Sequence, residues 1–259
     1  MSEGRRRVGD VTDREKSTSF GQAASAYESG RPGYPADAVA WLLAPVREPG
    51  RALRVADVGA GTGKLTRAVV ELGADVVAVD PDADMLATLR ENARGVPTFV
   101  GTAENLPLPD SGLDAVVMGQ AWHWVDVEPA SLETARVLRG GGVLGLIWNI
   151  RDDRVDWVRR LTAAMGGSNA EVLLATGGPR VAEPYGELEH REWSWERRIT
   201  LPQLRDLVVS RSDIITASPE KRAGIEAAVD GVVASVPELA DGGSVALPYV
   251  THAFRALRP

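Results

Sequence analysis

The feature that most constrains the fold of this chain is an alternation, between residues 54 and 149, of short apolar runs with amphipathic stretches of helical length. Residues 115–118 are apolar on both faces, which is typical of a strand buried on both sides. Strands of this kind separated by helices predict a parallel sheet covered by helices and joined by right-handed crossovers. The predicted fold class is therefore α/β, a doubly wound Rossmann-like sheet.

The expected elements follow from this pattern. Within the alternating region, strands are predicted at 54–58, 76–79, 97–100, 113–118 and 143–148, helices at 64–72, after Asp82 and at 131–138, and a turn at 140–142. Outside it, we expect a helix at 36–46, a strand at 188–200, helices at 202–210 and 219–233, and a last strand at 244–257 interrupted by Pro248.

The amino-acid composition excludes several kinds of functional site and partner. The chain has no cysteine, which excludes disulfides, zinc–thiolate sites and a cysteine nucleophile. Its net charge of −7 argues against a nucleic-acid partner, because phosphate binding needs a positive field. The first residues lack an apolar signal segment, and no apolar run reaches the length of a membrane span. We expect a cytoplasmic protein without membrane insertion.

A glycine-rich loop joins the first predicted strand to a helix, in the segment VADVGAGTGK at residues 55–64. A Walker A motif fails here, because Val58 stands where its first glycine belongs and Leu65 replaces its Ser/Thr. A dinucleotide fingerprint fits Gly59 and Gly61, but its third glycine position falls on Lys64. An NAD(P)-dependent oxidoreductase therefore remains an alternative. The third interpretation is G-x-G-x-G after an acidic strand residue.

Asp80 lies 21 residues after Gly59, at the end of the second predicted strand. A carboxylate at that position can accept hydrogen bonds from the two hydroxyls of a ribose. A ribose contact alone does not identify the cofactor, since NAD and other nucleoside cofactors all carry a ribose. The alternative role of Asp80 is to cap the following helix.

The loop resembles motif I of the class I S-adenosylmethionine-dependent methyltransferases, and the resemblance extends over residues 20–150. The segments GTAENLPLP at 101–109, LDAV at 113–116 and LRGGGVL at 138–144 are similar to the small-molecule group of ubiquinone/menaquinone type, methyltransferase type 11. RPGYP at 31–35, QAWHW at 120–124 and WN at 148–149 resemble the signature of one subset. The resemblance implies seven strands, mostly parallel, with an antiparallel last strand and helical cap elements.

The resemblance also implies S-adenosylmethionine as cofactor, S-adenosylhomocysteine as product, and a set of binding residues. The backbone at Gly59, Ala60 and Gly61 would pass the methionine part, Asp80 would hold the ribose, and Gln120 would lie near the methyl group. The chain departs from the group at Thr102, where many members carry Asp. The full expected set is Tyr27, Arg31, Gly59, Ala60, Gly61, Gly63, Asp80, Pro81, Met85, Ala103, Glu104 and Gln120.

The implied reaction is in-line transfer of a methyl group from a sulfonium to an O, N or C nucleophile of a small organic molecule. Alignment and exclusion of water would supply most of the catalysis. His123 is the candidate general base, since it follows the fourth predicted strand. We expect no metal in the site, because Asp82 and Asp84 suit the first turn of a helix. A non-catalytic cofactor-binding regulator or partner subunit is a further alternative.

The expected organisation is a flexible polar tail at residues 1–19 and one methyltransferase domain at 20–259. Within the domain, residues 20–50 form N-terminal cap helices, 51–150 the cofactor-binding core, and 151–259 the substrate-side insertion and final strands. The expected partner is a small-molecule methyl acceptor, and the expected assembly is a monomer or homodimer.

Overall fold

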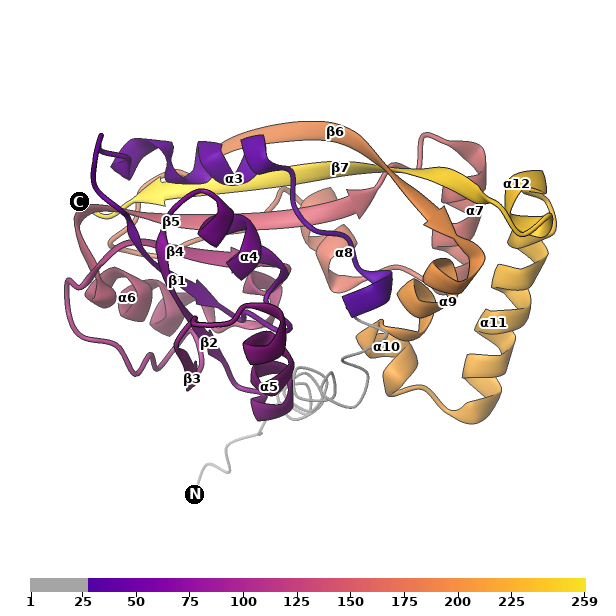
Figure 1. The fold of residues 1–259 in the computed structure, drawn as a ribbon, viewed down its shortest axis with the longest axis horizontal. Helices are drawn as coiled ribbons and strands as arrows, with labels where there is room; N and C mark the ends of the chain where they lie inside the picture. The colour runs from indigo at the N-terminus through magenta and orange to yellow at the C-terminus, as the bar shows by residue number, and fades with distance from the viewer. Residues whose placement is uncertain (1–27) are drawn as a thin grey trace, which may run out of the picture.

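The fold is seen in a computed structural model that describes residues 28–259 (Figure 1). The predicted tail at 1–19 and the predicted site residue Tyr27 lie outside the described residues. Seven strands form one sheet in the order β3-β2-β1-β4-β5-β7-β6. Their bounds are β1 Arg54–Val58, β2 Asp75–Asp80, β3 Thr98–Val100, β4 Leu113–Gly119, β5 Leu138–Arg151, β6 Glu189–Thr200 and β7 Ser244–Leu257.

The first five strands are parallel, and β7 runs antiparallel to both of its neighbours, β5 and β6. Strand order reverses between β1 and β4, so the carboxyl ends of these two strands flank the switch point where ligands bind in such sheets. The predicted fold class is confirmed, including the antiparallel last strand.

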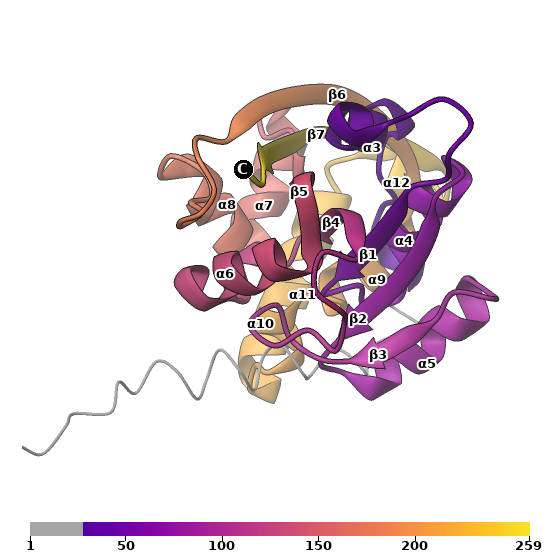
Figure 2. The ribbon, with the colours of Figure 1, turned by 90° about the vertical axis from the view of Figure 1, so that its left-hand side faces the viewer.

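Helices cover both faces of the sheet (Figure 2). On one face, α3 and α4 pack over β1, β4 and β5 around buried aliphatic side chains, and α5 packs on β2. On the other face, α6 and α8 pack against β5. The bounds are α3 Ala36–Leu43, η2 Ala44–Val46, α4 Lys64–Glu71, α5 Ala83–Asn92, η3 Trp122–Trp124, α6 Val127–Val137 and α8 Asn169–Ala175.

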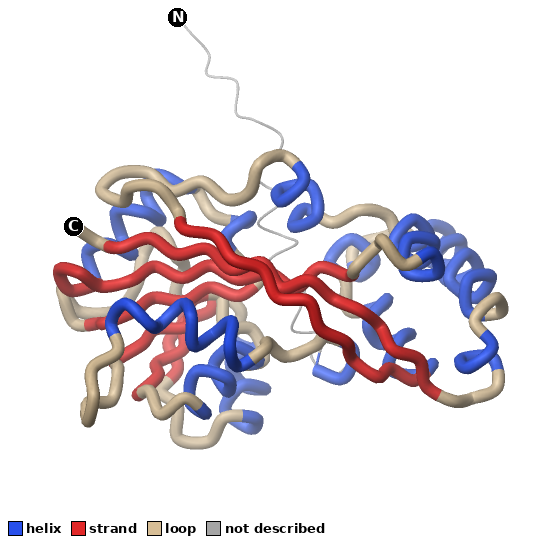
Figure 3. Tube along the Cα trace, turned by 90° about the horizontal axis from the view of Figure 1, so that it is seen from above, coloured by secondary structure: helices blue, strands red, loops and turns tan. Residues whose placement is uncertain are grey.

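The long strands β5, β6 and β7 extend beyond the core into a helical lobe (Figure 3). The lobe has its own apolar cluster, which joins Leu161, Leu207 and Val233 to the ends of β6 and β7. Its helices are α7 Asp156–Met165, α9 Leu201–Val209, α10 Ser212–Ile215, α11 Pro219–Val233 and α12 Pro237–Ala240. Among the described residues, no helix has the length and apolar character needed to cross a membrane.

Two predicted boundaries are wrong. The turn expected at 140–142 lies inside β5, which begins at Leu138; pairing with β4 breaks after Leu138 and resumes at Val143, with Gly141 at a φ of +73° in the irregular stretch. Nor does Pro248 interrupt β7. Its carbonyl accepts from the Asp152 backbone N–H, just past the last residue of β5. The N–H that proline lacks would face the same side, beyond the end of β5, where no strand pairs with residue 248.

Candidate functional site

The glycine loop leaves β1 at the switch point and turns into α4. Gly59 has a φ of +69°, and a Cβ atom there would lie 2.6 Å from the Cβ of Ala121, so only glycine fits. Gly63, at a φ of +86°, precedes α4, and a Cβ atom on it would lie 2.8 Å from Leu89. Gly59 therefore lets the loop pack closely against Ala121, while Gly63 lets α4 pack closely against α5.

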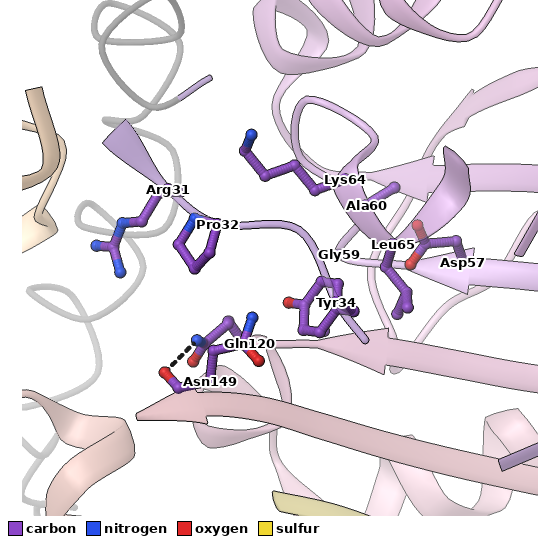
Figure 4. Close-up of a pocket in the computed structure, with 11 residues that line it drawn as sticks. Arg31, Pro32, Tyr34, Asp57, Gly59, Ala60, Lys64, Leu65, Gln120 and Asn149 are labelled. Atoms are coloured by element: carbon purple, nitrogen blue, oxygen red, sulfur yellow. Dashed lines mark hydrogen bonds between the residues drawn. The ribbon is translucent and has the colours of Figure 1, made fainter. Parts of the chain in front are cut away.

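A pocket opens beside this loop (Figure 4). It lies between the loop, the ends of β4 and β5, and the N-terminal segment 31–34, and its cavity volume is about 30 Å³. The lining residues are Arg31, Pro32, Tyr34, Asp57, Gly59, Ala60, Lys64, Leu65, Gly119, Gln120 and Asn149.

Asp57 supplies a buried carboxyl group at the base of the pocket. Its Oδ2 accepts from Thr66 Oγ1 at 2.6 Å, whereas its Oδ1 is buried without a hydrogen-bond partner. Burial raises the pKa of Asp57 to about 7, against the hydrogen bond from Thr66, which lowers it. A buried acceptor without a donor is costly, so Oδ1 is suited to a cationic or hydrogen-bond-donating ligand.

Asp80 lies at the carboxyl end of β2 and faces the loop. Its Oδ2 accepts from the Gly61 backbone N–H and its Oδ1 from the Asp82 backbone N–H, each at 2.8 Å. Burial raises the pKa of Asp80 to about 6, and the two backbone donors oppose that shift. Helix capping belongs instead to Asp82, whose Oδ1 accepts from Asp84 and Met85. Asp80 is thus held rigidly, with lone pairs left for further donors.

Gln120 follows β4 with a φ of +57°, in the left-handed region that non-glycine residues seldom occupy. This turn directs its side chain across the pocket, where Nε2 donates to the carbonyl of Asn149 at 2.9 Å (Figure 4). Asn149 in turn donates from Nδ2 to the carbonyl of Gly33 and accepts from Thr251 on Oδ1. Backbone strain held by such contacts is typical of functional sites.

The segment 28–34, which we call the strap, is held along its length. Glu28 contacts α4 through its carboxylate, which pairs with Lys64 and Arg67. Arg197 on β6 donates to the carbonyls of Ser29 and Gly30, and Arg31 donates from Nε to Ser210. The strap therefore joins the core, the long strands and the helical lobe over the pocket.

His123 lies in η3, beyond the residues that line the pocket. Its Nδ1 accepts from the indole Nε1 of Trp148 at 3.2 Å. Burial lowers the pKa of His123 to about 4, and the nearby charge of Arg31 lowers it further. The ring is therefore neutral at pH 7, and because Nδ1 accepts, the proton lies on Nε2. This tautomer offers a hydrogen-bond donor more readily than a base.

Beyond the pocket, β5 and β7 carry a second polar region. Arg151 lies opposite Tyr249 in the pairing of these strands, and it forms an ion pair with Glu171 at 2.7 Å. The hydroxyl of Tyr249 is buried without a partner. Burial raises the pKa of Tyr249, while the charges of Arg151, Arg197 and Arg31 lower it. Three cations from different parts of the chain thus act electrostatically on one buried hydroxyl.

The structure brings together four of the predicted cofactor residues around the pocket: Arg31, Gly59, Ala60 and Gln120. Asp80 and Gly61 join them through their mutual hydrogen bond. The adenine-side group is not part of the pocket lining. Met85 and Ala103 are buried, and Glu104 accepts from the Asp126 backbone N–H. That group is Pro81, Met85, Ala103 and Glu104.

Sequence reasoning assigned no role to several lining residues. The sequence does indicate Asp57, since it is the acidic strand residue before the glycine loop. Tyr34 and Asn149 stood in the quoted signature segments without a role. In the sequence, Lys64 marks only a mismatch to nucleotide-binding motifs, and nothing local indicates that its ammonium group contacts Glu28.

Comparison with known proteins gives consistent matches. Residues 56–146 match the family model described as "Methyltransferase domain". An uncharacterized methyltransferase of Mycobacterium tuberculosis is 46% identical over 243 residues, 94% of this chain and 97% of that protein.

Solved structures share the fold. A protein of Anaeromyxobacter dehalogenans, assigned as a type II methyltransferase, aligns with a TM-score of 0.59 at 21% identity, covering 88% of this chain and 98% of that one. A phosphoethanolamine N-methyltransferase of Haemonchus contortus, solved with S-adenosylhomocysteine, aligns with a TM-score of 0.53 at 15% identity, covering 98% and 61%.

Proposed function

The chain belongs to the methyltransferase family of its relatives, and from this premise we propose that it is a class I enzyme that transfers the methyl group of S-adenosylmethionine to an O, N or C nucleophile of a small organic molecule. The observation that carries the proposal is the pocket beside the glycine loop, with its unpartnered Asp57 Oδ1. The methionine part of S-adenosylmethionine has an ammonium group, and Asp57 Oδ1 is suited to accept a hydrogen bond from it.

The remaining residues fit the other parts of the cofactor. The backbone at Gly59, Ala60 and Gly61 would hold the methionine part, and Asp80 would accept from the ribose hydroxyls. Gln120, fixed by Asn149, would lie beside the methyl group. The proposed adenine neighbours are Pro81, Met85, Ala103 and Glu104; Gly63 positions α4, and Tyr27 and Arg31 complete the proposed set.

The bound cofactor supplies a methyl group already activated by its sulfonium charge, so the chain mainly binds, orients and excludes water. Arg31 lies at the pocket edge, where its guanidinium suits the cofactor carboxylate. Arg31, Pro32 and Tyr34 of the strap line the pocket (Figure 4). We retain His123 as the candidate catalytic residue, with Nε2–H as donor to the acceptor molecule rather than as general base.

The acceptor is proposed to lie toward the lobe, within residues 151–259. The buried hydroxyl of Tyr249 and the neighbouring Arg151 and Arg197 form its polar wall. A donor-rich wall favours an acceptor molecule with an oxygen or carboxylate group. The cytoplasmic location, the monomeric or homodimeric state and the division of the domain expected from the sequence are parts of the same proposal.

Thermal-shift titration with S-adenosylmethionine, S-adenosylhomocysteine and NAD tests the cofactor, since a specific ligand raises the unfolding temperature. Stabilisation by NAD alone would overturn the proposal in favour of an oxidoreductase. A second assay measures S-adenosylhomocysteine formation with a panel of small carboxylic acids, phenols and amines. Tight binding of S-adenosylmethionine without turnover on any of them would favour a non-catalytic regulator.

A further inference from the structure

Two of the three histidines of the chain meet a glutamate on the paired strands β6 and β7, away from the pocket. His190 and Glu192 are two residues apart on β6, so their side chains lie on the same face of the sheet. His252 on β7 lies directly opposite Glu192 and diagonal to His190. Strand pairing alone therefore brings three metal-ligating side chains to one place.

The ligand atoms converge. His252 Nδ1 lies 3.3 Å from His190 Nε2 and 3.2 Å from Glu192 Oε1, and His190 Nε2 lies 3.7 Å from the same oxygen. Zinc binds histidine nitrogen and carboxylate oxygen at about 2.0–2.1 Å, which places neighbouring ligands of a tetrahedral site about 3.3–3.4 Å apart. Two of the three separations lie within about 0.2 Å of that edge length, and the third, from His190 to Glu192, is about 0.3 Å longer.

Hydrogen bonds among His190, Glu192 and His252 satisfy these three side chains less completely than a bound cation would. A single proton on His252 Nδ1 can be donated to His190 or to Glu192, but not fully to both. Among the described residues, Arg154 also interacts electrostatically with Glu192, although its main partner is Asp152.

The rings are already ordered. His190 stacks on Phe254 with centroids 4.1 Å apart and planes 8° apart. The planes of His190 and His252 lie within 7° of each other. Side chains fixed by stacking lose less rotamer freedom when they bind a ligand. Glu192 has no arginine or lysine within ion-pair distance among the residues that the structure describes, so its charge is available to a cation.

We propose that His190, Glu192 and His252 form a binding site for a late first-row divalent cation, best matched by Zn²⁺, with a fourth position open to solvent. Two imidazoles and one carboxylate are a donor set that zinc accepts. The ion would link β6 to β7 near the end of their pairing that begins at Glu189 and Arg255. The proposal is independent of the methyl-transfer function, since none of the three residues lines the pocket.

Calorimetric titration of the full chain with ZnCl₂ tests the site. The protein is freed of any purification tag, treated with EDTA and held at pH 7.5. We expect one Zn²⁺ per chain, with binding at least tenfold weaker in Glu192→Gln and in His252→Asn. Two control variants should bind as the wild type does: Glu189→Gln, an exposed carboxylate on the same strand that pairs with Arg255, and His123→Asn, the remaining histidine.

Co²⁺ provides a second readout, because tetrahedral Co²⁺ with nitrogen ligands absorbs visible light strongly. We expect this absorption in the wild type and in Glu189→Gln, and its loss in His252→Asn. Circular dichroism verifies that each variant is folded. Absence of stoichiometric Zn²⁺ binding by the folded wild type would overturn the proposal. So would unchanged affinity in His252→Asn, or loss of binding in His123→Asn in its place.

Discussion

The indole Nε1 of Trp148 donates a hydrogen bond to Nδ1 of His123 across 3.2 Å, and this contact fixes which nitrogen of the imidazole carries the proton. In Trp148→Phe the aromatic packing against Phe254 would remain, but His123 would lose its donor. We expect kcat to fall about tenfold, the value of one lost transition-state hydrogen bond of about 1.4 kcal/mol, with the Kd for S-adenosylhomocysteine unchanged.

The same contact predicts the pH profile. Because the pKa of His123 is about 4, the wild-type rate should show no inflection near 6.5 that disappears in His123→Ala. A rate in Trp148→Phe equal to that of the wild type would show that the tautomer of His123 does not matter to turnover.

Asp80 is expected to control cofactor affinity. In Asp80→Asn the charged acceptor is lost, and the amide must also replace the bond from the Gly61 backbone N–H. We expect the Kd for S-adenosylhomocysteine to rise about 10- to 100-fold, equivalent to about 1.4–2.7 kcal/mol. Asp84→Asn, an exposed acid in the first turn of α5, is the matched control and should change the Kd less than twofold. Equal effects in the two variants would argue against a ribose contact.

Asp57 should make stability depend on pH. Its pKa is about 7 in the folded chain and 3.8 ordinarily, so between these values the folded state binds more protons than the unfolded state. Stability must therefore fall as pH rises from about 4 to 7, and Asp80, with a pKa of about 6, adds to the same slope. Urea unfolding at pH 5, 6, 7 and 8 measures it. Asp57→Asn should reduce the slope, most visibly between pH 6 and 7.

Two buried tyrosines should respond in opposite ways to loss of the hydroxyl. Tyr249 Oη has no partner, so Tyr249→Phe should stabilise the chain by about 1 kcal/mol while raising KM for the acceptor. Tyr185 Oη donates to Thr134 at 3.1 Å, so Tyr185→Phe should destabilise the chain by about 1 kcal/mol with KM unchanged. Denaturant unfolding and steady-state kinetics check both. Lower stability in Tyr249→Phe would refute the prediction of a vacant hydroxyl.

A single methyl group added at Gly30 should displace the strap. A Cβ atom on Gly30 would lie 2.3 Å from the backbone nitrogen of Leu207 in α9, whereas a Cβ atom on Gly33 would meet nothing within 4 Å. We expect Gly30→Ala to cost about 2 kcal/mol of stability, since overpacking of this kind typically costs 1–3 kcal/mol, and to weaken cofactor binding through Arg31. Gly33→Ala should change both by little. Thermal unfolding with and without S-adenosylhomocysteine distinguishes the two variants.

The parts of the site that the sequence predicts are those built from neighbouring residues. The loop at Gly59 follows directly from the apolar strand before it, and Asp80 follows from the next strand. The contact of Arg197 with Gly30 spans 167 positions, and no local pattern encodes it. The pairing of His190 and Glu192 with His252 depends in the same way on the register of β6 and β7. Tertiary contacts of this length are set by packing rather than by periodicity.

The misplaced start of β5 has a related cause. Three consecutive glycines are typical of a turn, and Gly141 does adopt a positive φ. Pairing of Leu138 with Leu113 nevertheless keeps the residues before the glycines in the sheet. A local signal for a break was thus overridden by strand pairing on either side of it.

The continuity of β6 and β7 from the core into the lobe has a mechanical consequence. Twelve consecutive residue pairs join the two strands, so there is no hinge at the boundary between the core and the lobe. The lobe therefore cannot rotate as a separate rigid body without breaking the sheet. The strap is held by the ion pairs of Glu28 and by hydrogen bonds that involve Arg31, Arg197 and Asn149. Ligand exchange should therefore require the strap to detach from the core. The exchange rate should rise with ionic strength, because salt screens the ion pairs of Glu28 with Lys64 and Arg67.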